Sequence, residues 1–131
     1  MGIYLNGKKA YGLFQEDCAL TYYVDKTDIL DEFVPILERK KKSEKAGSDK
    51  GKGLKYICIT RPRRFGKTMM ANMIASYLGK GVDSSKAFDR LKASRYDWYK
   101  EHLNRHNVIQ ITFTEMPNEI TNFEQYISRV K

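Results

Sequence analysis

The chain has 131 residues, the usual size of one domain, and its 41% hydrophobic residues suffice for a single core. No apolar run approaches the roughly 18 residues of a membrane-spanning helix, and the N-terminus lacks the pattern of a signal peptide. A formal net charge of +8 favours phosphate-bearing partners. We therefore expect a cytoplasmic protein with no membrane partner.

The N-terminal third gives weak strand signals and then one helical pattern. Residues 1–20 are mixed, and residues 20–24 are rich in strand-forming types. Apolar residues follow helical spacing over residues 29–37, with Pro35 inside the pattern, so we expect a kinked or shortened helix. The lysine-rich residues 40–53 contain no apolar side chain larger than alanine, which predicts a flexible, solvated loop.

A strand, a loop and a helix are expected next. Residues 54–60 form a short apolar run typical of a strand, and residues 61–66 form a loop. A helix is predicted from Lys67, because the apolar residues that follow repeat at i, i+3 and i+4 and share one face. Glycines at positions 79 and 81 should end it. The two cysteines show no metal-ligand spacing, and Cys58 is interpreted as a buried thiol of the strand.

The last third alternates between helical and strand patterns. Weak helical patterns cover residues 84–91 and 96–106, and β-branched residues predict a second strand over residues 108–113. Residues 120–130 are amphipathic and predict a helix. Strands that alternate with helices predict an α/β fold with a mostly parallel sheet.

A Gly-Lys-Thr triplet stands between the predicted strand and helix, in the order that a phosphate-binding loop (P-loop, or Walker A motif) requires. Backbone N–H groups of such a loop bind phosphate oxygens, and the helix adds its positive N-terminal end. Lys67 supplies a charge for the β- and γ-phosphates of ATP, and the Thr68 hydroxyl is a ligand for Mg²⁺. The candidate ATP- and phosphate-binding residues are Arg63, Arg64, Phe65, Gly66, Lys67, Thr68 and Met69.

One position departs from the P-loop pattern GxxxxGK[ST]. Arg61 replaces its first glycine. Pro62 biases the residue before it toward extended geometry, which needs no glycine. A basic turn capped by glycine is the alternative interpretation of this segment.

Two blocks of sequence resemble the predicted AAA-ATPase-like family. Residues 23–27 (YVDKT) are similar to a segment typical of its members, and residues 60–68 (TRPRRFGKT) are similar to the family's P-loop block. Arginine at the first P-loop position is normal in that family. The resemblance spans nearly the whole chain and implies ATP binding. Full-length members often end in a PD-(D/E)XK nuclease-like domain.

Several further side chains are candidates for ligand contact. Tyr23 and Asp25 are candidate nucleotide-proximal residues. Tyr23, like Tyr22, can stack on a base, although core packing is the favoured interpretation. Asp25 is a candidate together with Thr27, because in AAA-type ATPases the segment before the first strand often lies near the adenine. Asp25 is equally interpretable, with its neighbour Thr27, as a helix cap that needs no ligand. His102 and His106 have the i, i+4 spacing of some zinc sites, but no third ligand is evident, so we interpret them as surface histidines on one helix.

The residues that would complete hydrolysis are not evident. The family's Walker B strand, an apolar run ending in acidic residues, normally lies well downstream of residues 108–113, and nothing matches it. Glu115 follows a strand but fits the Walker B position poorly, so the catalytic residues are unassigned. The resemblance implies that residues 1–131 are the N-terminal part of one AAA-like P-loop domain that lacks its Walker B half.

The sequence therefore predicts a chain that binds ATP and Mg²⁺ but does not hydrolyse ATP at a meaningful rate alone. The rest of the ATPase, or another protein chain, is the expected partner that completes the sheet. The main alternative is a basic module that binds DNA or RNA through its lysines and arginines without hydrolysis. A degenerate, purely structural domain is the third interpretation.

Overall fold

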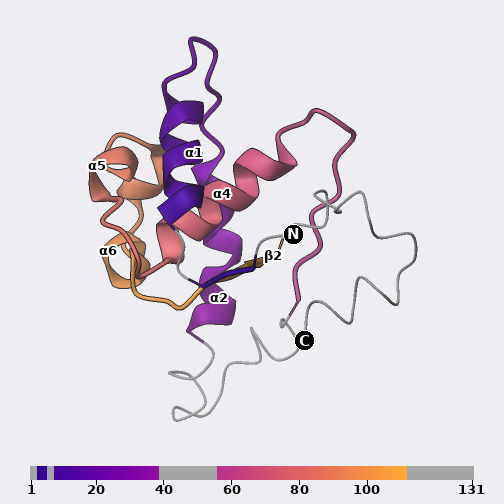
Figure 1. Cartoon of the computed structure of the whole chain (residues 1–131). Helices are drawn as coiled ribbons and strands as arrows, with labels where there is room; N and C mark the ends of the chain where they lie inside the picture. Colours follow the sequence, from indigo (N-terminus) through magenta and orange to yellow (C-terminus); the bar gives the residue numbers. More distant parts are fainter. Residues whose placement is uncertain (1–2, 6–7, 39–55, 112–131) are drawn as a thin grey trace, which may run out of the picture.

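The computed structural model describes residues 3–5, 8–38 and 56–111. Helices dominate this part of the chain, and α1 (Lys8–Cys18) packs side by side with α4 (Lys67–Leu78) (Figure 1). Within the described ranges, no helix is long and apolar enough to cross a membrane. The elements in chain order are β1 (Ile3–Leu5), α1 (Lys8–Cys18), the 3₁₀ helix η1 (Thr27–Glu32), α2 (Val34–Leu37), α4 (Lys67–Leu78), α5 (Ser85–Phe88), the 3₁₀ helix η2 (Lys92–Arg95), α6 (Tyr99–His102) and β2 (Ile109–Ile111).

The expected α/β fold with a mostly parallel sheet, a partial P-loop NTPase sheet, is wrong for this structure. The strands of the described chain, β1 and β2, form one short antiparallel ladder with Ile3 opposite Ile111 and Leu5 opposite Ile109. Residues 56–60, the described part of the strand predicted over residues 54–60, are irregular and pair with no strand among the described residues. A strand exists only where a neighbour accepts and donates its backbone hydrogen bonds, and an apolar run does not supply that neighbour.

Aromatic side chains from four helices meet in the centre of the core. The Tyr77 ring of α4 lies 5.4 Å from the Phe88 ring of α5 and 5.9 Å from the Tyr99 ring of α6. Phe88 also stacks on Phe14 of α1, with 4.8 Å between ring centroids. The Tyr77 hydroxyl donates a buried hydrogen bond of 2.7 Å to the Tyr99 carbonyl oxygen. The buried core consists of Phe14, Leu30, Met70, Met73, Tyr77, Leu78, Phe88, Ala93 and Tyr99.

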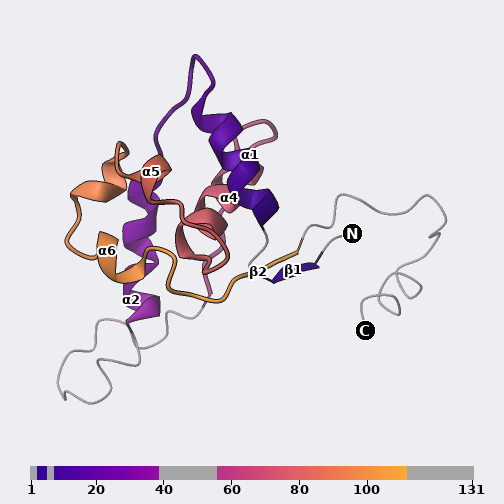
Figure 2. The ribbon, with the colours of Figure 1, turned by 60° about the vertical axis from the view of Figure 1, so that its left-hand side comes forward.

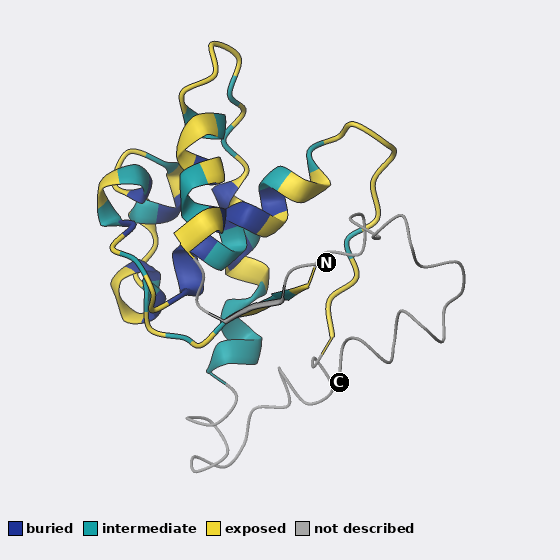
Figure 3. Ribbon diagram, viewed as in Figure 1, coloured by how far each residue is buried: buried dark blue, intermediate teal, exposed yellow. Residues whose placement is uncertain are grey.

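The central helix α4 confirms the predicted helix in both its start and its end. Its buried face carries Met70, Met73 and Tyr77, which follow the helical repeat, and this face meets the other helices in Figure 3. The methionines therefore act as core residues. Gly79 follows the last residue of the helix, as expected.

Asn104 fastens the C-terminal end of α4 to the chain after α6. Its backbone is left-handed, with φ of 54°, and its side-chain amide donates to the carbonyl oxygens of Ser76 and Gly79 at 3.1 and 2.8 Å. Carbonyl groups at a helix C-terminus have no partner inside the helix, so these bonds satisfy groups that would otherwise need water. The chain then runs into β2.

The predicted helix around Pro35 is shortened, as expected. The 3₁₀ helix η1 ends at Glu32, and α2 is a separate turn with Pro35 in its first turn. Proline has no N–H to donate to the preceding turn, so the two segments do not merge into one regular helix. The weak helical patterns of the last third are likewise reduced to single turns, α5 and α6.

Two expectations for local structure fail. The first twenty residues contain the eleven-residue helix α1, which the sequence did not predict, because only Ala10 and Phe14 of that helix are buried. Cys58, predicted to be a buried thiol, is exposed, since the strand around it does not form. The loop over residues 40–53 and the helix over residues 120–130 lie outside the described residues.

Phe88→Ala should lower the free energy of unfolding by about 3–5 kcal/mol, because it removes a fully buried ring that contacts Phe14 and Tyr77. Phe65→Ala is the matched control, since the Phe65 ring is 58% exposed and its loss should change stability by at most about 0.5 kcal/mol. Urea denaturation followed by circular dichroism measures both values. Equal losses in the two variants would contradict this description of the core.

Candidate nucleotide-binding site

The loop before α4 turns sharply into the helix at two left-handed residues. Arg64 has φ of 65° and Gly66 has φ of 78°, a region that glycine adopts freely and arginine rarely. Left-handed residues in a turn direct neighbouring N–H groups toward one side, which is the geometry of an anion-binding nest. The local backbone therefore supports the phosphate-binding interpretation of this loop even though the predicted strand before it is absent.

The N–H groups of this loop are open to a ligand. Among the described residues, no group accepts a hydrogen bond from the amides of residues 64–68. The first four N–H groups of a helix have no acceptor inside the helix, and α4 is long enough, at 12 residues, to add a positive end. The loop and the start of α4 thus present unsatisfied donors in an exposed position (Figure 3).

Lys67 folds back over the loop from the first position of α4. Its ammonium group donates to the carbonyl oxygens of Arg61 and Pro62, at 2.6 and 3.1 Å. These two bonds close the loop into a ring and hold the ammonium charge beside its open amides. Thr68 follows and is exposed, so its hydroxyl is available to a metal ion or a phosphate.

Lys26 brings a second ammonium group to the loop from the YVDKT segment. Its Nζ atom lies 3.4 Å from the Phe65 carbonyl oxygen. It also lies 3.8 Å from the point where a Cβ atom on Gly66 would stand. Sequence reasoning missed Lys26 as a site residue, although it stands inside the segment that carried the family resemblance.

A cavity of about 270 Å³ adjoins the loop. Its walls are the segment before η1, the loop, the methionine-bearing face of α4, and α1 with Phe14 and Asp17. The cavity brings together segments some forty residues apart in the chain. Its lining residues are Phe14, Asp17, Tyr22, Tyr23, Val24, Lys26, Arg64, Phe65, Gly66, Met69, Met70 and Met73.

The predicted site residues divide between this cavity and the exposed loop. Arg64, Phe65, Gly66 and Met69 line the cavity together with the candidate Tyr23. The other predicted phosphate-binding residues do not line it. These are Arg63, Lys67 and Thr68, which lie exposed on the loop and the first turn of α4. The candidate Asp25 does not line the cavity either.

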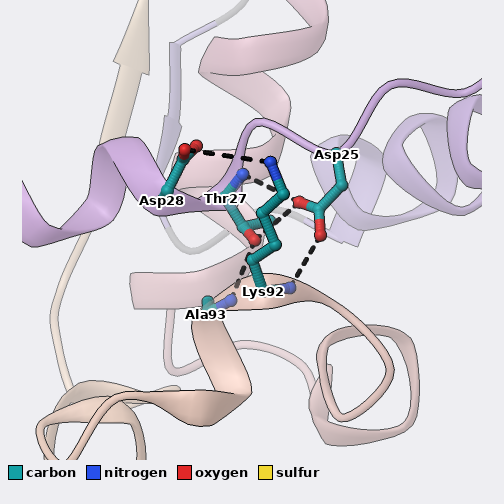
Figure 4. A network of polar contacts seen from close by, with 5 residues as sticks. All are labelled: Asp25, Thr27, Asp28, Lys92 and Ala93. Atoms are coloured by element: carbon teal, nitrogen blue, oxygen red, sulfur yellow. Dashed lines mark hydrogen bonds and ion pairs between the residues drawn. The ribbon is translucent and has the colours of Figure 1, made fainter.

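Asp25 anchors the segment that forms one wall of the cavity. Its Oδ1 atom accepts hydrogen bonds from the Thr27 amide and hydroxyl, at 2.9 and 2.7 Å, and its Oδ2 atom accepts one from the Lys92 amide at 2.6 Å. The Thr27 hydroxyl in turn accepts a bond of 3.0 Å from the Ala93 amide (Figure 4). Asp25 and Thr27 thereby fasten the start of η1 to η2, but neither is the expected helix cap, because the N-cap position of η1 is Lys26 and no side chain caps it.

The charge state of Asp25 follows from this network. Partial burial pushes the pKa of Asp25 upward, but the hydrogen bonds from Thr27 and Lys92, with the nearby Lys92 charge, outweigh it. The pKa of Asp25 therefore lies below its ordinary value, and the carboxylate is ionised at neutral pH. At Tyr23 the net shift is upward. Burial, and to a smaller extent the nearby Cys18 thiol, raise the pKa of the Tyr23 hydroxyl, so Tyr23 stays neutral.

The two histidines are not arranged as predicted. His102 is buried, with 4% of its surface exposed, and α6 ends at this residue. The left-handed turn at Asn104 then brings His106 back, so the rings stack with centroids 5.3 Å apart without sharing a helix. The candidate acid Glu115 lies outside the described residues.

Asp25→Asn should lower the free energy of unfolding by about 1–2 kcal/mol at pH 7, because a carboxamide cannot accept hydrogen bonds at both of its terminal atoms. A depressed pKa in the folded chain means that this contribution is present above about pH 4 and is lost as the pH falls through the folded value. The difference between wild type and variant should therefore narrow below about pH 4.

Chemical denaturation at several pH values measures this difference. Asp28→Asn is the control, because it breaks only an exposed ion pair of 3.9 Å with Lys92, and such pairs contribute about 1 kcal/mol at most. A difference between wild type and Asp25→Asn that stays constant down to about pH 3 would contradict the role given to the carboxylate.

Comparison with known proteins identifies the family of the chain. The family model described as predicted AAA-ATPase matches residues 48–131, which is more than half of the chain and includes the loop and α4. No curated protein and no solved structure matches the chain. The chain belongs to the predicted AAA-ATPase family, whose members are ATPase-like in general character.

Proposed function

We propose that this chain binds ATP with Mg²⁺ on the loop before α4, with the phosphates on the open amides and the base in the adjoining cavity. The observation that carries the proposal is the direct contact between the two halves of the site. Arg64, Phe65 and Gly66 belong to the loop and also line the cavity. A ligand that has both a polyphosphate and a flat base matches this combination.

The phosphate half has the donors that a polyphosphate needs. The amides of residues 64–68 have no acceptor among the described residues, and Lys67 and Lys26 bring two ammonium groups to the same loop. Charge-assisted hydrogen bonds to phosphate are stronger than bonds between neutral groups. In the bound state, Lys67 would exchange its bonds to loop carbonyls for bonds to phosphate oxygens.

The base half has the size and lining of a small binding pocket. Its volume of about 270 Å³ is close to the lower limit of ligand pockets, roughly 300 Å³. Tyr22 and Tyr23 supply aromatic faces, and the α4 methionines supply adaptable apolar contacts. The carboxylate of Asp17 also lines the cavity and can accept a hydrogen bond from the amino group of a base.

Thr68 is the residue that fits Mg²⁺. Its hydroxyl is a hard oxygen ligand, it is exposed next to Lys67, and Mg²⁺ commonly takes its remaining ligands from phosphate oxygens and water. Hydrolysis requires, in addition, an acid that orients the metal and the attacking water. No such acid is assigned here, so the proposal for residues 1–131 is binding without significant turnover.

Lys67→Ala should weaken the binding of Mg-ATP by at least about tenfold, because it removes a charged donor to phosphate. Lys86→Ala is the matched control, since Lys86 is an exposed lysine of α5 that does not line the cavity. Isothermal titration calorimetry measures both, and the control should bind like wild type. Equal affinity in wild type and Lys67→Ala would contradict the proposal.

Tyr22→Ala should weaken ATP binding several-fold and leave the binding of inorganic tripolyphosphate unchanged. Tyr22 lines the cavity but is 92% exposed, so its removal leaves the core intact. A base that stacks on an aromatic ring gains about 1–3 kcal/mol when the contact is complete, and Tyr22→Phe should retain this gain. A parallel loss for ATP and tripolyphosphate would place the base elsewhere.

Nucleic-acid binding is the second candidate, and the exposed arginines at positions 61, 63 and 64 favour it. Contacts to a nucleic-acid backbone depend steeply on salt and do not require a nucleotide pocket. Binding of single-stranded DNA that ATP does not displace and that Tyr22→Ala leaves unchanged would support this candidate. Displacement of DNA by ATP would instead mean that both ligands use the same phosphate-binding loop.

A further inference from the structure

A cluster of metal-ligating side chains joins the end of α2 to α6, away from the loop before α4. Glu38 caps the C-terminus of α2, and Glu101 and His102 are the last two residues of α6. Figure 2 shows the two helices at the same side of the molecule. One ligand atom from each side chain lies within 4.8 Å of the others, the one such grouping of three in the described ranges.

The His102 ring leaves one nitrogen buried without a hydrogen-bond partner. Its Nδ1 atom lies 3.1 Å from Nε2 of His106, a hydrogen-bond distance. Its Nε2 atom is buried and bonds to nothing in the described chain. The Glu38 carboxylate is 3.8 Å away from Nε2, which is too long for a hydrogen bond. A buried polar atom without a partner is costly and needs an explanation.

The contact with His106 indicates what this nitrogen can do. If His106 Nε2 accepts, His102 carries its proton on Nδ1 and presents a bare lone pair on Nε2 toward the two glutamates. A metal-binding histidine usually donates from its other ring nitrogen in this way, which fixes its tautomer and orientation. A cation between this nitrogen and the two carboxylates supplies the partner that Nε2 lacks.

We propose that Glu38, Glu101 and His102 form a binding site for a divalent transition-metal cation, of which Zn²⁺ is the representative. One imidazole with two carboxylates suits zinc and its neighbours better than Mg²⁺ or Ca²⁺, which prefer all-oxygen sites. Zinc bonds of about 2.0–2.2 Å place tetrahedral ligands roughly 3.4 Å apart. The donors therefore need to approach by about 1 Å, a movement within reach of the flexible glutamate side chains.

The site links two elements and opens to solvent on one side. Glu101 is exposed, Glu38 is half-buried and His102 is buried, so a cation has a path in and a fixed ligand at the inner end. Because its ligands come from α2 and α6, the metal stabilises the folded chain relative to the unfolded one. The proposal does not depend on nucleotide binding, which uses the loop before α4.

The alternative is an ion pair between a protonated His102 and Glu38, which predicts no metal binding. The test is titration of the tag-free, EDTA-treated chain with zinc chloride, without nucleotide or Mg²⁺, in a Cys58→Ser background because the exposed Cys58 thiol also binds zinc. We expect one Zn²⁺ per chain and a rise in melting temperature of about 10 °C when free zinc is about a hundredfold above Kd.

Substitutions at the two glutamates then locate the site without disturbing the core. Glu101→Gln and Glu38→Gln should each weaken zinc binding at least about tenfold. Glu32→Gln, an exposed glutamate of η1 outside the cluster, should bind like the parent chain. Nitrogen NMR of the His102 ring should show a proton on Nδ1 in the metal-free chain and a shift of Nε2 on adding zinc.

Three results would overturn the proposal. They are the absence of zinc binding by the folded chain, zinc binding that both glutamine substitutions leave unchanged, and a doubly protonated His102 ring that zinc does not perturb. Because Glu101 is exposed, its substitution should leave the fold intact, and a melting curve of the metal-free variant checks this directly.

Discussion

The packing of Tyr77, in the last turn of α4, is the interaction on which the rest of the structure depends. Its ring contacts Phe88 and Tyr99, and its hydroxyl bonds to the Tyr99 carbonyl oxygen. A buried hydroxyl is tolerated only with a partner, so this one contact fixes both the rotation of α4 and the position of α6. Because the loop of residues 61–66 enters at the other end of α4, the core also fixes the direction in which the loop amides point.

A second constraint sets the distance between the segment before η1 and the loop before α4, which are two of the walls of the cavity. The Asp25 and Thr27 side chains accept hydrogen bonds from backbone amides of η2, which hold the segment with Tyr22, Tyr23 and Lys26 in place. The same segment contacts the loop, where Lys26 donates to the Phe65 carbonyl oxygen. Asp25 of the YVDKT segment thus holds this segment in position, and its neighbours Tyr23, Val24 and Lys26 line the cavity.

The loop before α4 concentrates positive charge without a paired acid on the loop itself. Arg61, Arg63, Arg64 and Lys67 stand within seven successive residues, and Lys26 adds a further charge from outside. Like charges at this spacing repel one another, and an anion with several oxygens relieves that repulsion most fully. The cluster of His102 and the glutamates has the opposite character, since there electron-rich groups face each other. The two proposed sites therefore select ligands of opposite charge on separate parts of the molecule.

The sequence by itself determined the features that depend on local interactions. The start and end of α4, the break at Pro35 and the loop with Gly66 and Lys67 all follow from residues within a few positions of one another. The tertiary structure decided the features that depend on distant partners. Whether residues 56–60 form a strand depends on a neighbouring strand, and Lys26 joins the loop because η1 is fastened to η2. The burial of His102 depends likewise on helices from other parts of the chain. Local propensity acts along the chain, whereas pairing, burial and charge clustering arise only when segments far apart in sequence are packed together.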